Sequence, residues 1–69
     1  MARLIITTRN GITSESEVRD YREAESEIAR FQRTYLAQHP RDAISDISVI
    51  DHTGSLIARS YNGRLEMFP

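Results

Sequence analysis

Few side chains in this sequence could act as a general base or a metal ligand. It contains two histidines, His39 and His52, and no cysteine. A general base needs an orienting partner and a pocket, and a chain of 69 residues has little room for a pocket. His39 precedes a proline, which is typical of a helix end, and His52 stands in a predicted turn before Gly54. No phosphate-binding glycine loop or nucleophile motif is present. We therefore expect no catalytic residues, no metal site and no cofactor.

A dense acidic run is the first group of residues with a possible role in binding. Six of the ten acidic residues lie between positions 15 and 27, with two arginines among them. Closely spaced carboxylates can present a phosphate-like charge pattern to a basic groove and speed association with it. As an alternative, the run is a solvated surface. The candidate partner-binding residues here are Glu15, Glu17, Asp20, Glu23 and Glu27. If they bind a partner, charge reversal at Glu23 and Glu27 should slow association.

Arginine and aromatic side chains near the end of the chain form the second group. The candidate partner-binding residues are Arg59, Tyr61, Arg64 and Phe68, next to Ile50 and Ile57. Arginine and aromatic residues are enriched at the hot spots of protein interfaces. The same types stack on single-stranded bases when a sheet displays them. Alternatively, the two isoleucines pair across strands under the other side chains, or the face packs against a second copy of the chain.

The first part of the chain predicts a β-hairpin. Residues 3–9 are rich in β-branched side chains and end at Asn10-Gly11, which favours a two-residue type I′ turn. Residues 12–19 then return as a partly exposed edge strand, with Ile12 and Val18 on its inner side.

A helix that starts immediately after the turn is the alternative for this segment. Ser14 would be its N-cap and Glu17 the capping-box partner. Asp20 and Glu23 offer the same box six residues later. We prefer the hairpin because Asn-Gly is the more specific signal.

A helix is predicted over residues 21–38. Apolar residues recur at spacings of three and four and form one stripe, which comprises Tyr21, Ala24, Ile28, Phe31, Tyr35 and Leu36. Acidic residues lie early and arginines late, which suits the helix dipole. Pro40 disfavours helical geometry at the residue before it, so the helix should end there.

Three short strands are predicted in the remainder, over residues 46–51, 55–61 and 64–68, with turns at 52–54 and at Asn62-Gly63. Period two assigns one wholly apolar set to the side under the helix: Ile47, Val49, Leu56, Ala58, Leu65 and Met67. The candidate arginines and aromatic residues fall on the other side. The predicted fold class is therefore α+β, a single domain over residues 1–69 of order ββαβββ. One amphipathic helix packs on one face of an antiparallel sheet and leaves the other face open.

Composition limits the possible partners. The net charge is −1, and all nine basic residues are arginine. A protein that binds nucleic acid mainly through phosphates usually has a clear basic excess. No apolar run approaches the roughly 20 residues that a membrane span needs, and no signal-peptide pattern is present. We expect a soluble protein that does not bind a membrane.

Several features together resemble a known class of proteins. The hairpin, the helix EAESEIARFQ and the segment DISVIDHTGSLIARSYNGR, with its rhythm of strand, Asp-x-x-Gly, strand and Asn-Gly, are similar to small phage and mobile-element proteins of the anti-CRISPR type. The resemblance implies one helix on an antiparallel sheet, a cytoplasmic location in a bacterial host, and an inhibitor that binds a CRISPR surveillance complex and blocks access of target DNA.

The function that we expect is thus that of a non-enzymatic protein-binding module, with a larger protein complex such as a CRISPR effector as its partner. Two alternatives remain open. One is a small nucleic-acid-binding regulator that uses its open sheet face. The other is a homodimeric structural protein that buries this face against a second copy.

Overall fold

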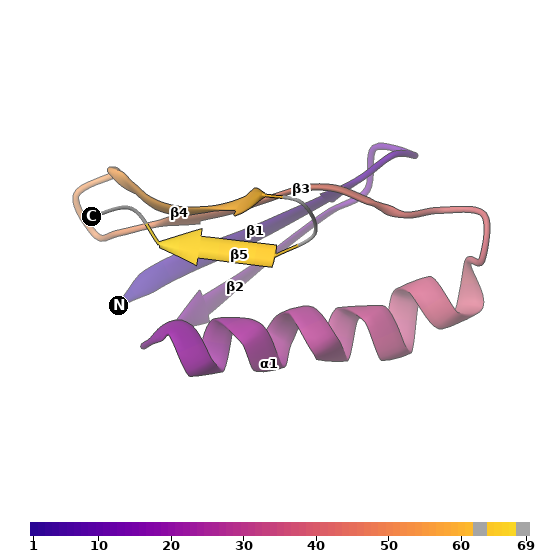
Figure 1. Ribbon diagram of the computed structural model, residues 1–69, viewed down its shortest axis with the longest axis horizontal. Coiled ribbons are helices and arrows are strands. Elements are labelled where there is room, and N and C mark those ends of the chain that lie inside the picture. Colours follow the sequence, from indigo (N-terminus) through magenta and orange to yellow (C-terminus); the bar gives the residue numbers. More distant parts are fainter. Residues whose placement is uncertain (62–63, 68–69) are drawn as a thin grey trace.

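The helix and strands confirm the predicted order. The computed structural model describes residues 1–61 and 64–67. Its elements are β1 (Ala2–Thr8), β2 (Thr13–Val18), α1 (Tyr21–Phe31), the π-helical turn η1 (Gln32–Leu36), β3 (Ile44–Ile50), β4 (Leu56–Tyr61) and β5 (Arg64–Met67). The strands form one antiparallel sheet in the order β2-β1-β3-β4-β5, and the helix lies across one face (Figure 1). The chain therefore has the expected α+β fold.

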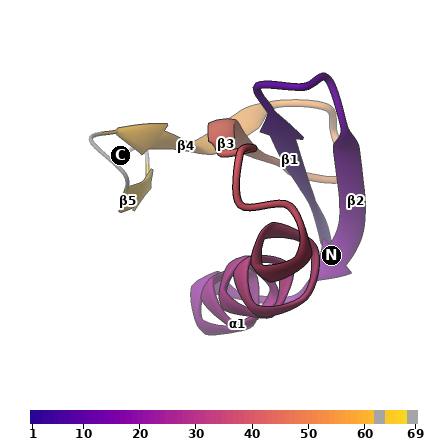
Figure 2. The same ribbon diagram turned by 90° about the vertical axis from the view of Figure 1, so that its right-hand side faces the viewer.

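The position of β1 explains why the helix must cross the sheet. β1 pairs with β2 on one side and with β3 on the other, antiparallel to both. β2 and β3 therefore run in the same direction, and the chain between them has to return along the sheet. The helix makes this return beneath β1 and its neighbours, and Figure 2 shows the resulting two layers.

Two hairpin turns share one construction, and it differs from the predicted type I′ turn. In the first, the Gly11 amide donates to the Thr8 carbonyl over 3.0 Å and the Thr8 amide to the Ile12 carbonyl over 2.9 Å. The centre of the turn is thus Arg9-Asn10, and Gly11 follows with a φ of +86°. A glycine at this position removes the Cβ clash of the left-handed region. The prediction of a hairpin is confirmed, but the two-residue turn type is wrong.

The second turn, between β3 and β4, repeats these bonds. The Gly54 amide donates to the Asp51 carbonyl, and Gly54 has a φ of +88°. Asp51 also accepts from the amides of Thr53 (2.9 Å) and Ser55 (3.0 Å) and from the Thr53 hydroxyl. These bonds lower the pKa of Asp51, the Thr53 hydroxyl contributing most. His52 is exposed beside them, as a turn residue. The predicted turn at Asn62-Gly63 lies outside the described residues.

Residues 13–18 form a strand and not a helix. Each of them pairs with β1, from Thr7↔Thr13 to Ala2↔Val18. The helix starts later, where the Asp20 carboxylate accepts a 2.8 Å hydrogen bond from the Glu23 amide as an N-cap. Val18 is buried as expected, but Ile12 is 43% exposed. The assignment of Ile12 to the inner side is wrong because this residue belongs to the turn, before the pairing with β1 begins.

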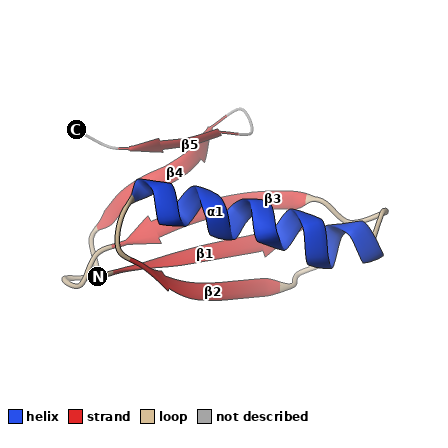
Figure 3. Cartoon of the chain, turned by 90° about the horizontal axis from the view of Figure 1, so that it is seen from below, coloured by secondary structure: helices blue, strands red, loops and turns tan. Residues whose placement is uncertain are grey.

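The helix presents the predicted stripe to the sheet. Ala24 is buried, and Ile28 and Phe31 pack against the core. Figure 3 shows that the helix runs across the central strands and that β5 lies beyond it. After Phe31 the helix widens into the π-helical turn η1, and helical geometry continues to residue 38, as predicted.

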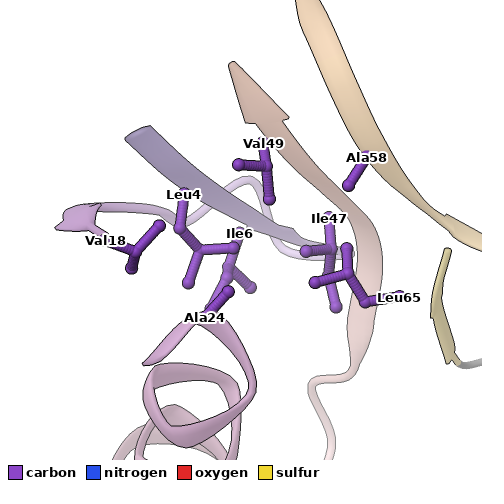
Figure 4. Packing of buried hydrophobic residues seen from close by; sticks show 8 residues of the cluster. All are labelled: Leu4, Ile6, Val18, Ala24, Ile47, Val49, Ala58 and Leu65. Atoms are coloured by element: carbon purple, nitrogen blue, oxygen red, sulfur yellow. The ribbon is translucent and has the colours of Figure 1, made fainter. Parts of the chain in front are cut away.

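The core lies between the helix and the inner face of the sheet. Its buried residues are Leu4, Ile6, Val18, Ala24, Ile47, Val49, Ala58 and Leu65 (Figure 4). Four of the six residues predicted for this face are among them. Met67, also predicted there, has a side chain outside the described part of the structure.

A β-bulge overturns the predicted position of Leu56. Val49 pairs with Ala58 but Ile50 pairs with Leu56, so Ile57 is the extra residue on β4. The bulge breaks the period of two. Ile57 therefore packs against the core, and Leu56 lies opposite Ile50 on the outer face, 39% exposed. Ile57 was expected on the open face, so these two neighbours exchange their predicted positions.

Opposite faces of β1 provide a test of this core. Leu4→Ala is expected to lower the free energy of unfolding by about 3 kcal/mol, because it removes a fully buried side chain and leaves a cavity. Ile5→Ala, on the half-buried outer face, should lower it by about 1 kcal/mol. Urea unfolding followed by circular dichroism measures both values. Equal losses in the two variants would contradict the assignment of faces.

Candidate protein-binding face

A cluster of polar side chains at the end of the helix is the first place to look for chemistry. The Tyr35 hydroxyl donates to Asp42 Oδ2 over 2.7 Å. Asp42 Oδ1 accepts from the amides of Asn10 (3.2 Å) and Ala43 (2.8 Å), and the Thr8 hydroxyl binds the same carboxylate. Asp42 and Thr8 are both buried, so the cluster joins the first hairpin, the helix end and the start of β3.

The hydrogen bonds determine how this carboxylate titrates. Burial raises the pKa of Asp42, but the bonds from Tyr35, Thr8 and the two amides outweigh burial and lower the pKa to about 2. Its hydrogen bond to Asp42 in turn raises the pKa of Tyr35, with burial adding to the effect. At neutral pH the pair is thus a carboxylate and a neutral phenol. A base with so low a pKa is a poor proton acceptor, which assigns Asp42 a structural role.

His39 is placed at the end of the helix, as the sequence predicts. Its Nδ1 lies 2.8 Å from the Tyr35 carbonyl, and its ring stacks on that of Tyr35 with centroids 4.2 Å apart. Tyr35 stacks in turn on Phe31 at 5.2 Å. The ring of His39 thereby completes the last helical turn. Among residues 1–61 and 64–67, no three His, Asp or Glu side chains are grouped so that they could hold a metal ion.

The open face of the sheet, on the side away from the helix, has an aliphatic centre. Ile50 and Leu56 are direct cross-strand partners, and Ile5 is the diagonal neighbour of Ile50 on β1. We call these three residues the aliphatic strip. It crosses three adjacent strands, and the helix lies on the opposite face of the sheet (Figure 2).

Charged residues border the aliphatic strip on both sides. On one side, Arg3 lies 3.8 Å from Glu15. On the other, Arg59 lies 3.5 Å from Asp46, and its register partner on β5 is Glu66. All these side chains are largely exposed, so the ion pairs add little to stability but give the face a fixed pattern of charge. A shallow hollow of about 390 Å³ opens beside Ile50.

The structure divides the predicted acidic group between two faces. Glu15 and Glu17 point outward from β2 on the open face, because they pair with Ile5 and Arg3. Asp20, by contrast, is occupied as the N-cap of the helix.

The remaining two acidic candidates lie on the helix. Glu23 accepts a 3.1 Å bond from Arg19, and Glu27 lies 4.0 Å from Arg30. Residues that are adjacent in sequence are thus separated because the chain changes from a strand to a helix at residue 20.

Of the second predicted group, Arg59 lies on the open face together with Ile50. Tyr61 and Arg64 pair across β4 and β5, and their side chains are outside the description, as is the whole of Phe68. Sequence reasoning missed Arg3, Ile5 and Leu56 on this face. The first two could have been found by extending period two to β1, whereas Leu56 is placed by a bulge that carries no sequence signal here.

In the described part of the chain, no helix has the length and apolar character needed to cross a membrane.

Comparison of the chain with protein-family models, with curated proteins and with solved structures finds no match.

The low pKa of Asp42 predicts how stability depends on pH. Because this pKa falls from 3.8 to about 2 on folding, its contribution is complete above about pH 4 and is lost as the pH falls towards 2. Asp42→Asn should therefore lower Tm at pH 7 by about 5–10 °C and make stability less sensitive to pH between 4 and 2. Thermal unfolding at pH 7, 4 and 2.5 measures both effects.

Asp51→Asn is the matched control, since the pKa of Asp51 is also lowered but its carboxylate bonds only within its own turn. It should lower Tm at pH 7 by less than Asp42→Asn does. A loss as large as that of Asp42→Asn would contradict the special role of the cluster.

Proposed function

We propose that this chain is a non-enzymatic protein-binding module that acts by occupying a surface of a larger protein complex through its open sheet face. The observation that carries the proposal is the aliphatic strip of Ile5, Ile50 and Leu56, which lies on the face opposite the helix and is bordered on two sides by charged residues. An apolar centre with a polar rim is the usual anatomy of a protein interface. Apolar side chains in such a centre supply affinity, and the charged rim supplies orientation and rate.

The charge of the face favours a partner with a basic surface. Glu15 and Glu17 stand side by side on β2, and only the neighbouring Arg3 offsets them on that side of the strip. Protein surfaces that track nucleic acid are basic, because they neutralise phosphates. A CRISPR surveillance complex has such a surface, and the resemblance to anti-CRISPR proteins in element order agrees with this partner. In this proposal the chain inhibits by covering the path of the target DNA.

Direct binding of nucleic acid is less well supported. Both described arginines of the open face, Arg3 and Arg59, lie within 4 Å of a carboxylate. A phosphate would have to displace these carboxylates and would meet Glu15 and Glu17 beside them. The ring stacking that single-stranded bases need is also not provided by the described side chains of this face.

The aliphatic strip can be tested by capturing partners from a bacterial lysate that contains CRISPR effectors. Leu56→Glu should strongly reduce capture, because it places a charge at the centre of the interface and weakens binding by about tenfold or more. Ile12→Glu is the matched control, because Ile12 is equally exposed but lies in the first hairpin turn. Capture should survive nuclease treatment.

Loss of the captured proteins on nuclease treatment would favour the nucleic-acid alternative. Equal capture by the two variants would contradict a role for the open face. A dimer of the free chain that Leu56→Glu converts to monomers would instead indicate that a second copy covers the strip.

Neutralising the two acidic residues of the open face is expected to change the association rate more than neutralising two acidic residues of the helix. Glu15→Gln with Glu17→Gln should slow association with the captured partner by about threefold or more at low salt, and less at high salt. Glu23→Gln with Glu27→Gln produces the same net charge, but these residues lie on the helix, so the rate should change little. Stopped-flow or surface-based kinetics measure both. If only the helix pair slowed association, the docking surface would be the helix.

A further inference from the structure

β5 forms an open edge of the sheet beside a groove. Among the described residues, β4 is the one strand that pairs with it. β5 lies beyond the helix (Figure 3). A groove of about 600 Å³ is lined by residues of both elements. The buried Ile47 and Leu65 and the half-buried Ile28 give the groove an apolar floor. An open edge next to a groove with an apolar floor is an arrangement to which extended peptides can bind as added strands.

The Tyr21 hydroxyl is hydrogen-bonded to one backbone carbonyl of this edge. This hydroxyl lies 3.0 Å from the Leu65 carbonyl and 3.2 Å from Glu25 Oε2. The hydroxyl has one proton, so it can donate to only one of these acceptors at a time. Alternate residues of a strand direct their N–H and C=O groups to opposite edges of the strand. The carbonyl of Leu65 is accessible to the Tyr21 side chain of the helix. Leu65 therefore directs its backbone groups away from β4, towards the open edge.

We propose that the β5 edge binds an extended, basic segment of a partner protein as a sixth strand, and that the Tyr21 hydroxyl competes with this segment for the Leu65 carbonyl. When the segment pairs with β5, its amide takes the Leu65 carbonyl, and the Tyr21 hydroxyl donates to Glu25 instead. After the exchange, the Leu65 carbonyl and the Tyr21 hydroxyl each still have a hydrogen-bond partner. This site does not use the aliphatic strip of Ile5, Ile50 and Leu56, so the proposal does not depend on the function proposed above.

The residues around β5 define the chemistry of the segment. A residue opposite Leu65 would face the helix side and the apolar floor, whereas a residue opposite Glu66 would face the other side of the sheet. Glu25 and Glu66 are exposed, and neither takes part in the ion pairs among the described residues. Glu25 gives the groove side of this edge a negative charge, and Glu66, whose neighbour Leu65 faces the core, gives one to the other side of β5. The segment that fits therefore alternates aliphatic and basic side chains.

A synthetic peptide of three arginine-valine repeats with blocked ends is the probe for this site. In a titration followed by amide chemical shifts, the changes should be confined to residues 64–67, Tyr21 and the facing helix residues. Tyr21→Phe removes the competing hydroxyl and should tighten binding by about three- to tenfold. Glu66→Gln should weaken it by about threefold.

Modified peptides test strand pairing and charge separately. Two peptides N-methylated at alternate amides block the two sets of N–H groups, and one of the two should lose binding. A glutamate-valine peptide of the same length should not bind. Leu56→Glu should bind the arginine-valine peptide as tightly as the unmodified chain does, so this site can fail or succeed independently of the open face.

Three results would overturn the proposal. Chemical-shift changes centred on Ile50 and Leu56 would place the peptide on the open face. Full binding by both N-methylated peptides would exclude strand pairing. A dimer of the free chain joined through β5 would show that a second copy occupies the edge.

Discussion

The fold depends on one buried carboxylate that three separate segments must satisfy. Asp42 is only 8% exposed, and an ionised group in such a position is tolerated only when hydrogen bonds replace its lost water. Its donors come from the first hairpin (Thr8 and Asn10), from the helix end (Tyr35) and from its own loop. The bond within the loop is local, but those from the hairpin and from the helix end form only when these segments pack against the loop. The cluster therefore fixes where the helix stops and where β3 begins.

The opposite end of the helix is held by a different set of bonds. Asp20 caps the first turn, and the Tyr21 hydroxyl reaches the Leu65 carbonyl on β5. A helix held at both ends covers only the strands that lie between its anchors. Among residues 1–61 and 64–67, no helix or strand covers the outer face of the sheet, and β5 pairs on one side alone. Both candidate surfaces exist because a single helix covers only part of one face of a five-stranded sheet.

Sequence reasoning predicted the elements of this fold better than their relation to one another. The helix stripe, the strand at residues 13–18 and the strand order along the chain follow from local periodicity and capping residues. Period two failed at Leu56 and Ile57, because a bulge depends on how two strands fit together and not on either strand alone. The acidic run did not form one surface for a related reason. Its residues are close in sequence, but the chain changes from a strand to a helix within the run and places them on different faces. Asp42 was not singled out, since its role exists only after distant segments meet.

The size of the molecule limits which surface can bind a large partner. A stable complex of standard size buries about 800 Å² on each partner. The chain exposes 5077 Å² in total, so such an interface would take about a sixth of its surface. Only a whole face of so small a domain provides that area. The outward side of the helix is lined by charged residues, including the ion pairs Arg19–Glu23 and Arg30–Glu27, whereas the open sheet face combines aliphatic residues with a charged border. Full burial of the three aliphatic side chains contributes about 1 kcal/mol each, which is too little for tight binding alone. Tight binding on this face therefore needs further contacts around the aliphatic strip, while the charged border is what distinguishes one partner from another.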